Sequence, residues 1–302
     1  MLNIGGIIMN KIMMIGIPSY GIDIEELSSL INGLKLNSYY DVHIFFNFKD
    51  RLHYDNDLIK IQEFESKYPE VITHKLNTSY GDGLLRTRRC IIEYFTMTEY
   101  EYLLNFDADD TLNIPDELYN TLGAGFCDTN YPILAKYNYE LLNHKDDSDK
   151  FMYSRENFSI DNTSDFLKYD KKFLPGIAFS VMNKCLARMI ISFIQFNFDS
   201  LPVMNLCEDV VFTLIALDFK CVYVVYGSIS LGVYNNESVS TTFSSDAMSD
   251  YNKVSYSTSF IFGDLESRLH NIDCKWLSYY ECCVKSYLYY VVKKKFEGIN
   301  IQ

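Results

Sequence analysis

The sequence lacks a basic excess, a long apolar run and paired cysteine motifs, and it has a single tryptophan. Its 302 residues include 27 Lys or Arg against 40 Asp or Glu, a net charge of −13. Broad neutralisation of nucleic-acid phosphates needs the opposite balance, so this binding mode is disfavoured. No apolar run reaches the roughly 18–20 residues of a membrane span, so we expect a soluble protein.

The cysteines do not form a recognisable framework. All eight are scattered through apolar segments, and none belongs to a C-x-x-C motif. This distribution favours buried free thiols over disulfides or a zinc site. Free thiols are typical of a reducing compartment, so the expected location is the cytoplasm.

The first hundred residues alternate between patterns of buried strands and amphipathic helices. Strands are predicted at 11–21, 41–48, 71–76 and 101–107, and helices at 23–36, 55–67 and 81–97. Strands separated by helical crossovers form a parallel sheet with helices on both faces. In such sheets ligands bind outside the carboxyl ends of the strands.

The rest of the chain is less regular. The polar segment 143–172 is predicted to be a surface loop or a mobile lid, and Asn183 is a candidate helix cap. The last fifty residues carry a helical apolar stripe. The other predicted elements are a helix at 115–123, a strand at 131–141, a strand and helix within 173–193, a helix at 207–217, and strands at 221–228 and about 230–236.

An acidic motif follows the fourth predicted strand, in "YLLNFDADD". Side chains alternate along a strand, so Asp107 and Asp109 point to one side and Asp110 to the other. Two converging carboxylates repel each other unless a cation lies between them, and Mg²⁺ or Mn²⁺ takes oxygen ligands from carboxylates and phosphates together. The motif therefore fits a metal–phosphate site or, alone, a solvated acidic turn.

Motifs of this kind occur in two protein families. "FDADDTL" resembles the first motif of haloacid-dehalogenase-like hydrolases, in which Asp107 would be the nucleophile. That motif normally ends the first core strand, whereas here three predicted strands precede it. A phosphohydrolase is thus the alternative interpretation.

The second resemblance extends over about residues 11–242. "IGIPSYG", "GDGLLRTRRC", "YLLNFDADD", "CEDVVF" and "YNNESVST" resemble, in order and spacing, the GT-A nucleotide-diphospho-sugar transferases, most closely glycosyltransferase family 2. The resemblance implies an α/β GT-A (Rossmann-like) fold: a mixed, mainly parallel central sheet flanked by helices, with a C-terminal helical extension. The implied domains are a catalytic domain at 1–245, with a nucleotide-sugar half at about 11–125 and an acceptor half at about 126–245, and a packed helical extension at 246–302.

The resemblance also assigns the donor site. It implies that the nucleotide sugar contacts the first-strand turn, the end of the second strand and the helix before the acidic motif, and that Mn²⁺ or Mg²⁺ binds the acidic motif. The family usually has an acid where this chain has Asn47. The implied nucleotide-binding residues are Pro18, Ser19, Tyr20, Asn47, Gly83, Arg88 and Asp107, and the implied metal ligands are Asp107 and Asp109.

"CEDVVF" matches the family's Glu-Asp pair, which implies Asp209 as general base with Glu208 as its neighbour. A carboxylate that takes the acceptor's proton as the new C–O bond forms implies inversion. Taken alone, both acids could merely cap a helix. The implied activity is metal-dependent, inverting transfer of a sugar, with a UDP-sugar as the expected donor.

The acceptor is open. The only tryptophan, Trp276, lies outside any Gln-x-x-Arg-Trp signature of processive synthases, and no His lies between 208 and 269 to complete a metal shell. The Ile-, Asn-, Tyr- and Lys-rich composition suggests an AT-rich genome, as in some phages. A glycan, protein or small molecule is expected before a hydroxymethylated base of phage DNA. A non-catalytic nucleotide-sugar-binding protein is a third class.

Overall fold

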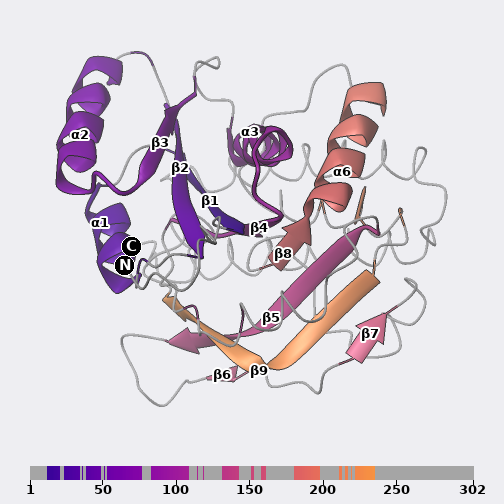
Figure 1. Ribbon diagram of the computed structural model, residues 1–302. Helices are drawn as coiled ribbons and strands as arrows, with labels where there is room; N and C mark the ends of the chain where they lie inside the picture. Colours follow the sequence, from indigo (N-terminus) through magenta and orange to yellow (C-terminus); the bar gives the residue numbers. More distant parts are fainter. Residues whose placement is uncertain are drawn as a thin grey trace, which may run out of the picture.

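The computed structural model describes residues 12–20, 24–34, 36, 39–48, 51, 53–76, 83–108, 114, 118, 131–142, 151–152, 158–160, 180–197, 211–212, 215–216, 219 and 222–234. The predicted βαβαβαβ order of the first hundred residues is confirmed (Figure 1). These elements are β1 (Met13–Tyr20), α1 (Ile24–Gly33), β2 (Tyr40–Asn47), α2 (Tyr54–Lys67), β3 (Ile72–Lys75), α3 (Gly83–Met97) and β4 (Tyr102–Asn105).

The second part of the described chain is richer in strands. The predicted 143–172 loop contains two short strands, and the two strands predicted near 221–236 are one strand, β9. Its elements are β5 (Ile133–Leu142), β6 (Phe151–Met152), β7 (Phe158–Ile160), β8 (Ser180–Asn183), α6 (Lys184–Asn197) and β9 (Val222–Tyr234). The predicted helix at 207–217 is described only at four helical residues, and the predicted helices after 245 lie outside the described residues.

A single mixed sheet joins all of these strands. Its order is β3-β2-β1-β4-β8-β5-β9-β7, with β6 paired to β5. The pairs among β1, β2, β3 and β4 are parallel, while β8 runs antiparallel to both β4 and β5. The carboxyl ends of β1, β2 and β4 therefore meet at one edge of the sheet, which is where the predicted donor site lies.

Helices cover both faces of the parallel part of the sheet (Figure 1). Leu27, Leu30 and Ile31 of α1 pack on one face with alternate residues of β1, β2 and β4. α3 packs on the other face so closely that a Cβ at Gly16 would overlap Ile91 Cγ2. Burial of these apolar faces supplies the main driving force for this layered arrangement.

The junction between β8 and α6 is fixed by the predicted cap. The Asn183 side-chain oxygen accepts hydrogen bonds from the backbone N–H of Leu186, at 3.0 Å, and of Ile133, at 3.1 Å. The first of these is the N-cap interaction, so this prediction is confirmed. The second ties the start of β5 to the same residue and thereby links β5, β8 and α6.

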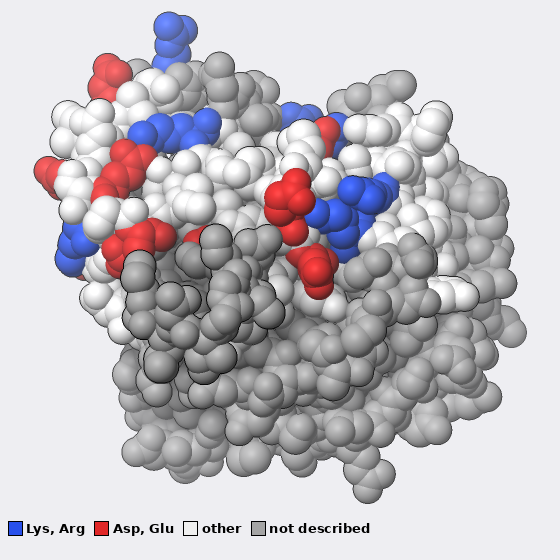
Figure 2. Space-filling model, in the orientation of Figure 1, with Lys and Arg blue, Asp and Glu red and all other residues white. Residues whose placement is uncertain are grey.

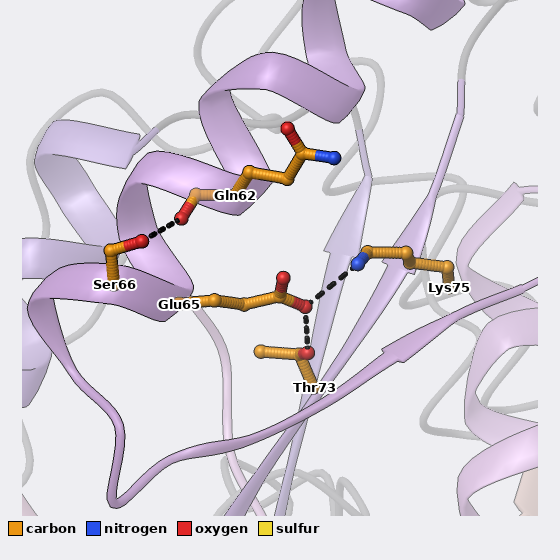
Figure 3. A network of polar contacts seen from close by, with 5 residues as sticks. All are labelled: Gln62, Glu65, Ser66, Thr73 and Lys75. Carbon is orange, nitrogen blue, oxygen red and sulfur yellow. Dashed lines mark hydrogen bonds and ion pairs between the residues drawn. The ribbon is translucent and has the colours of Figure 1, made fainter.

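A polar network holds α2 against β3 on the outer face of the sheet (Figure 3). One oxygen of Glu65 accepts a hydrogen bond from Thr73 and lies 2.8 Å from the Lys75 ammonium. Burial opposes ionisation of Glu65, but these hydrogen bonds and the Lys75 charge outweigh it and lower the pKa of the carboxyl below its usual range. Thr73 and Lys75 lie two positions apart on β3, and their shared contact with Glu65 fixes the register of α2 against this strand.

Among the described residues, no helix combines the length and the apolar character needed to cross a membrane.

Candidate active site

The predicted donor-site residues that the structure describes lie together at the carboxyl edge of the parallel strands. Tyr20 and Asn47 end β1 and β2 and are register partners, while Gly83 begins α3 and Asp107 follows β4. Pro18 and Ser19 are buried in the last part of β1. The topology thus brings to one edge segments that are up to ninety residues apart in sequence.

Arg88 and Asp107 form an ion pair beneath this edge. The guanidinium Nη2 of Arg88 donates to Oδ1 of Asp107. The Arg88 side chain is 1% exposed, whereas Asp107 is 31% exposed. No described residue hydrogen-bonds the second oxygen, Oδ2. Arg88 therefore binds one oxygen of Asp107 from the buried side. The second oxygen is available to a ligand.

Asn47 is part of a closed network with the start of α3. Its Nδ2 donates to Thr87 Oγ1 at 2.7 Å and to the Gly83 carbonyl at 3.3 Å, and Thr87 donates to the same carbonyl at 2.9 Å. Gly83 has a φ of 76°, a conformation that only glycine adopts without strain. The network therefore fixes the turn into α3, and with it the helix that carries Arg88.

Two buried amides at this edge have unused hydrogen-bonding capacity. Both polar atoms of the Asn105 side chain are buried without a partner among the described residues, and so is Oδ1 of Asn47. Asn105 lies two positions before Asp107, on the same face of the chain. Buried polar groups are nearly always satisfied, by an ordered water or a ligand where protein groups do not suffice. Sequence reasoning missed Asn105 and Thr87, although strand alternation with Asp107 was available as a signal for Asn105.

The remaining predicted residues cannot be placed. Asp109, Glu208 and Asp209 lie outside the described residues, and of Tyr20 the structure describes the backbone alone. Val211 and Phe212, which begin two positions after Asp209, are helical and buried. The roles assigned to the three acids remain predictions.

The part of the metal site that can be tested fits a hard divalent cation. Asp107 presents one oxygen that no described side chain occupies, and Asp109 follows two positions later in the sequence. Such cations take carboxylate oxygens as ligands. Within the described ranges no group of three His, Cys, Asp or Glu side chains could hold a metal by itself. A cation here would need Asp109 or phosphate oxygens in addition.

Figure 2 shows that basic and acidic side chains alternate over the described part of one face. No continuous basic surface covers that part of the face, as a site that follows a nucleic-acid backbone would require. The visible charge pattern agrees with the net charge of −13.

Comparison with known proteins identifies the fold. No protein-family model matches the sequence, and no curated protein sequence is significantly similar to it. The structure is similar to residues 1–349 of TarS from S. aureus, with a TM-score of 0.53 at 14% identity over 92% of this chain and 71% of that chain. A mannosyltransferase, PcManGT from Pyrobaculum calidifontis, solved with GDP-mannose and Mn²⁺, has a TM-score of 0.49 at 9% identity over 96% of this chain and 76% of that chain.

The sheet topology and the similarity to TarS confirm the predicted fold class. The chain has the GT-A, Rossmann-like fold, with a mixed sheet flanked by helices. The site described above lies at the carboxyl edge of that sheet.

Proposed function

We propose that the protein is a metal-dependent, inverting glycosyltransferase that moves a sugar from a nucleotide-diphosphate donor, expected to be a UDP-sugar, to an acceptor hydroxyl. The observation that carries the proposal is the Arg88–Asp107 pair at the carboxyl ends of β1, β2 and β4 in a GT-A fold. A glycan, protein or small molecule is the proposed acceptor.

Each described residue has a physical role in donor binding. Arg88 fixes the orientation of Asp107 and offsets its negative charge next to a second acid and a diphosphate. Asn47 and Thr87 hold the start of α3 in place through Gly83. Pro18 to Tyr20 would border the nucleotide at the end of β1. When bound by Asp107 and Asp109, a divalent cation would stabilise the charge of the departing diphosphate.

The chemical step needs a base on the far side of the sugar from the diphosphate. Asp209 would accept the proton of the acceptor hydroxyl as its oxygen bonds to the anomeric carbon and the bond from that carbon to the diphosphate breaks. Glu208 would orient Asp209 or the acceptor. Positioned proton transfer of this kind typically contributes about 10²–10⁴-fold to the rate.

The sheet topology disfavours the phosphohydrolase alternative. The strand that precedes Asp107 is the fourth in chain order, and β8 runs antiparallel beside it. Asp107 is also held by a buried arginine. The guanidinium draws charge from this carboxylate, which makes it a weaker nucleophile toward phosphorus.

The donor test is a thermal-shift panel of UDP, GDP, CDP and their common sugar conjugates, with Mn²⁺ or with chelator, on the wild type and Asp109→Ala. A ligand at 100 times its dissociation constant stabilises the folded state by about 2.7 kcal/mol. We expect one nucleotide to stabilise the wild type with metal and to have no effect on the variant. Stabilisation by phosphate analogues alone would support a hydrolase instead.

The catalytic test uses Asp209→Asn, once the donor is known. We expect the variant to keep nucleotide binding and to lose about 10²–10⁴-fold in transfer or donor hydrolysis. An unchanged rate would contradict the assignment of the base. If the wild type binds the nucleotide but catalyses neither transfer nor donor hydrolysis, the chain is a binding protein.

A further inference from the structure

A pocket lies between β3 and α3. It has a volume of about 450 Å³ and lies beside the outermost strand of the described sheet. Its lining includes Phe45, His74 and Lys75 from the strands and Glu93, Tyr94 and Met97 from the helix. Glu93 is nearly three helical turns from Gly83 by the usual pitch of about 3.6 residues per turn. None of the lining residues is among those assigned to the donor site.

A chain of hydrogen bonds behind the pocket fixes the proton of His74. Tyr100 donates its single hydroxyl proton to Asp41, at 2.6 Å, so its oxygen must accept from Nε2 of His43, 3.2 Å away. His43 then carries its proton on Nε2, and its Nδ1 is an acceptor. The partner of that Nδ1 is Nε2 of His74, at 2.9 Å, which must therefore donate.

The consequence is that neutral His74 presents an unprotonated Nδ1. No described residue hydrogen-bonds this nitrogen, and it is not among the polar atoms sealed from solvent. Burial lowers the pKa of His74 below its usual value, which keeps the ring neutral at physiological pH. His74, a lining residue of the pocket, thus carries a hydrogen-bond acceptor whose tautomer is set by Tyr100 and Asp41.

The charges around the pocket favour a neutral ligand. Glu93 supplies a second acceptor and is 38% exposed, with Arg89 at 3.7 Å. Lys75 is in the lining but is already paired with Glu65. A cation would meet the Lys75 ammonium, and an anion would meet the Glu93 carboxylate and the lone pair of His74. A neutral molecule with several hydroxyl donors avoids both conflicts.

The aromatic lining favours a ring with an apolar C–H face over a flat heteroaromatic ring. Phe45 and His74 stack on each other, with centroids 4.2 Å apart, so nothing can insert between them. Tyr94 is tilted by 59° from His74 and by 70° from Phe45, so the lining has no parallel pair of rings that could sandwich a nucleobase. A pocket with mostly apolar walls and a few convergent polar groups is typical of small-molecule sites.

We propose that this pocket binds a neutral saccharide ring, with its hydroxyls donating to His74 Nδ1 and to the Glu93 carboxylate and its C–H face against Phe45 and Tyr94. The site is separate from the donor site and does not depend on the proposed transfer reaction.

The test follows the imidazole nitrogens directly. Full-length protein labelled with ¹⁵N-histidine is titrated with the methyl glycosides of glucose, galactose, mannose and N-acetylglucosamine up to about 50 mM, well above the millimolar dissociation constants that correspond to about 4 kcal/mol. The His74 signals are assigned with His74→Gln. We expect an unprotonated Nδ1 in the free protein and a shift of its resonance with at least one glycoside.

Matched variants locate the binding. Glu93→Ala should weaken it about tenfold, the effect of losing one hydrogen bond to a charged group. Glu63→Ala removes an exposed carboxylate from α2 and should have no effect. Asp109→Ala should also bind normally, which distinguishes this pocket from the donor site. A protonated Nδ1, no shift with any glycoside, or equal binding by Glu93→Ala would overturn the proposal.

Discussion

Replacement of Asn47 by aspartate tests whether the second-strand residue has a structural role. In the resembling family this position usually carries an acid, so Asn47→Asp would restore the family's residue. In this structure the Asn47 amide instead donates two hydrogen bonds to acceptors at the start of α3. A carboxylate has no proton to donate to the Gly83 carbonyl. Thr87 can turn its own proton toward a carboxylate only by releasing Gly83.

The expected cost can be worked from these contacts. Each lost hydrogen bond removes about 0.5–1.5 kcal/mol of net stability, and the carboxylate is buried at a position that is 1% exposed. Burial beside a carbonyl oxygen penalises the charged form further. We expect Asn47→Asp to lower the free energy of unfolding by about 3 kcal/mol or more at pH 7.

The pH dependence of the variant has a definite sign. Burial raises the pKa of the new carboxyl in the folded state above the value of about 3.9 in the unfolded chain. The folded state then binds more protons than the unfolded state, so the variant loses stability as the pH rises above about 4. It regains this stability as the pH is lowered toward 4. Urea unfolding at pH 5 should therefore show a smaller difference between variant and wild type than at pH 7.5.

The control is Asn56→Asp, an exposed position in the first turn of α2. This change should alter stability by no more than about 0.5 kcal/mol. If Asn47→Asp is as stable as the wild type at neutral pH and binds nucleotide more tightly, the structural role is refuted. The side chain would then contact the nucleotide.

Two further predictions concern the packing on the two faces of the sheet. Gly16→Ala should destabilise the fold by about 1–3 kcal/mol in urea unfolding, because the added methyl overlaps Ile91, and an unchanged midpoint would show that α3 can move aside. Glu65→Gln should remove part of the acid sensitivity: the lowered pKa of Glu65 gives stability above its unfolded pKa that is lost as pH falls below about 4.5. If wild type and Glu65→Gln unfold in parallel from pH 6 to pH 3, the Lys75 pairing contributes nothing to stability.

The elements predicted best from the sequence are those whose signal is local. The first four strands and three helices have strong periodicity and clear boundaries, and the Asn183 cap is a contact between residues three positions apart. The errors arose where pairing is not local. β9 is continuous because it pairs with β5 along its length, with a register shift after Tyr137 that accommodates the sequence around Gly227. The sequence pattern predicted two strands here, but the pairing with β5 makes them one.

Prediction of the candidate site also succeeded where the signal is local and failed where it depends on contacts between distant elements. Motif order placed Gly83, Arg88 and Asp107 at one edge, and the structure agrees. It was harder to predict that Arg88 is the arginine that points into the core, since the sequence has three arginines within four positions of one helix. Arg88 shares the buried stripe of α3 with Leu85 and Phe95, a helical spacing that indicates burial. Its partner Asp107, on another element, is not visible in that pattern.

The Arg88–Asp107 ion pair decides which acidic residue should be replaced to test the metal site. A guanidinium that is 1% exposed needs a partner, because an unpaired buried charge costs several kcal/mol. Asp107→Ala would therefore remove a metal ligand and also leave Arg88 without this carboxylate, at a cost reduced by the 31% exposure of Asp107. Loss of nucleotide binding in that variant would have two explanations. Asp109→Ala does not disrupt the Arg88 pair, so a metal-dependent loss there reports on the site itself.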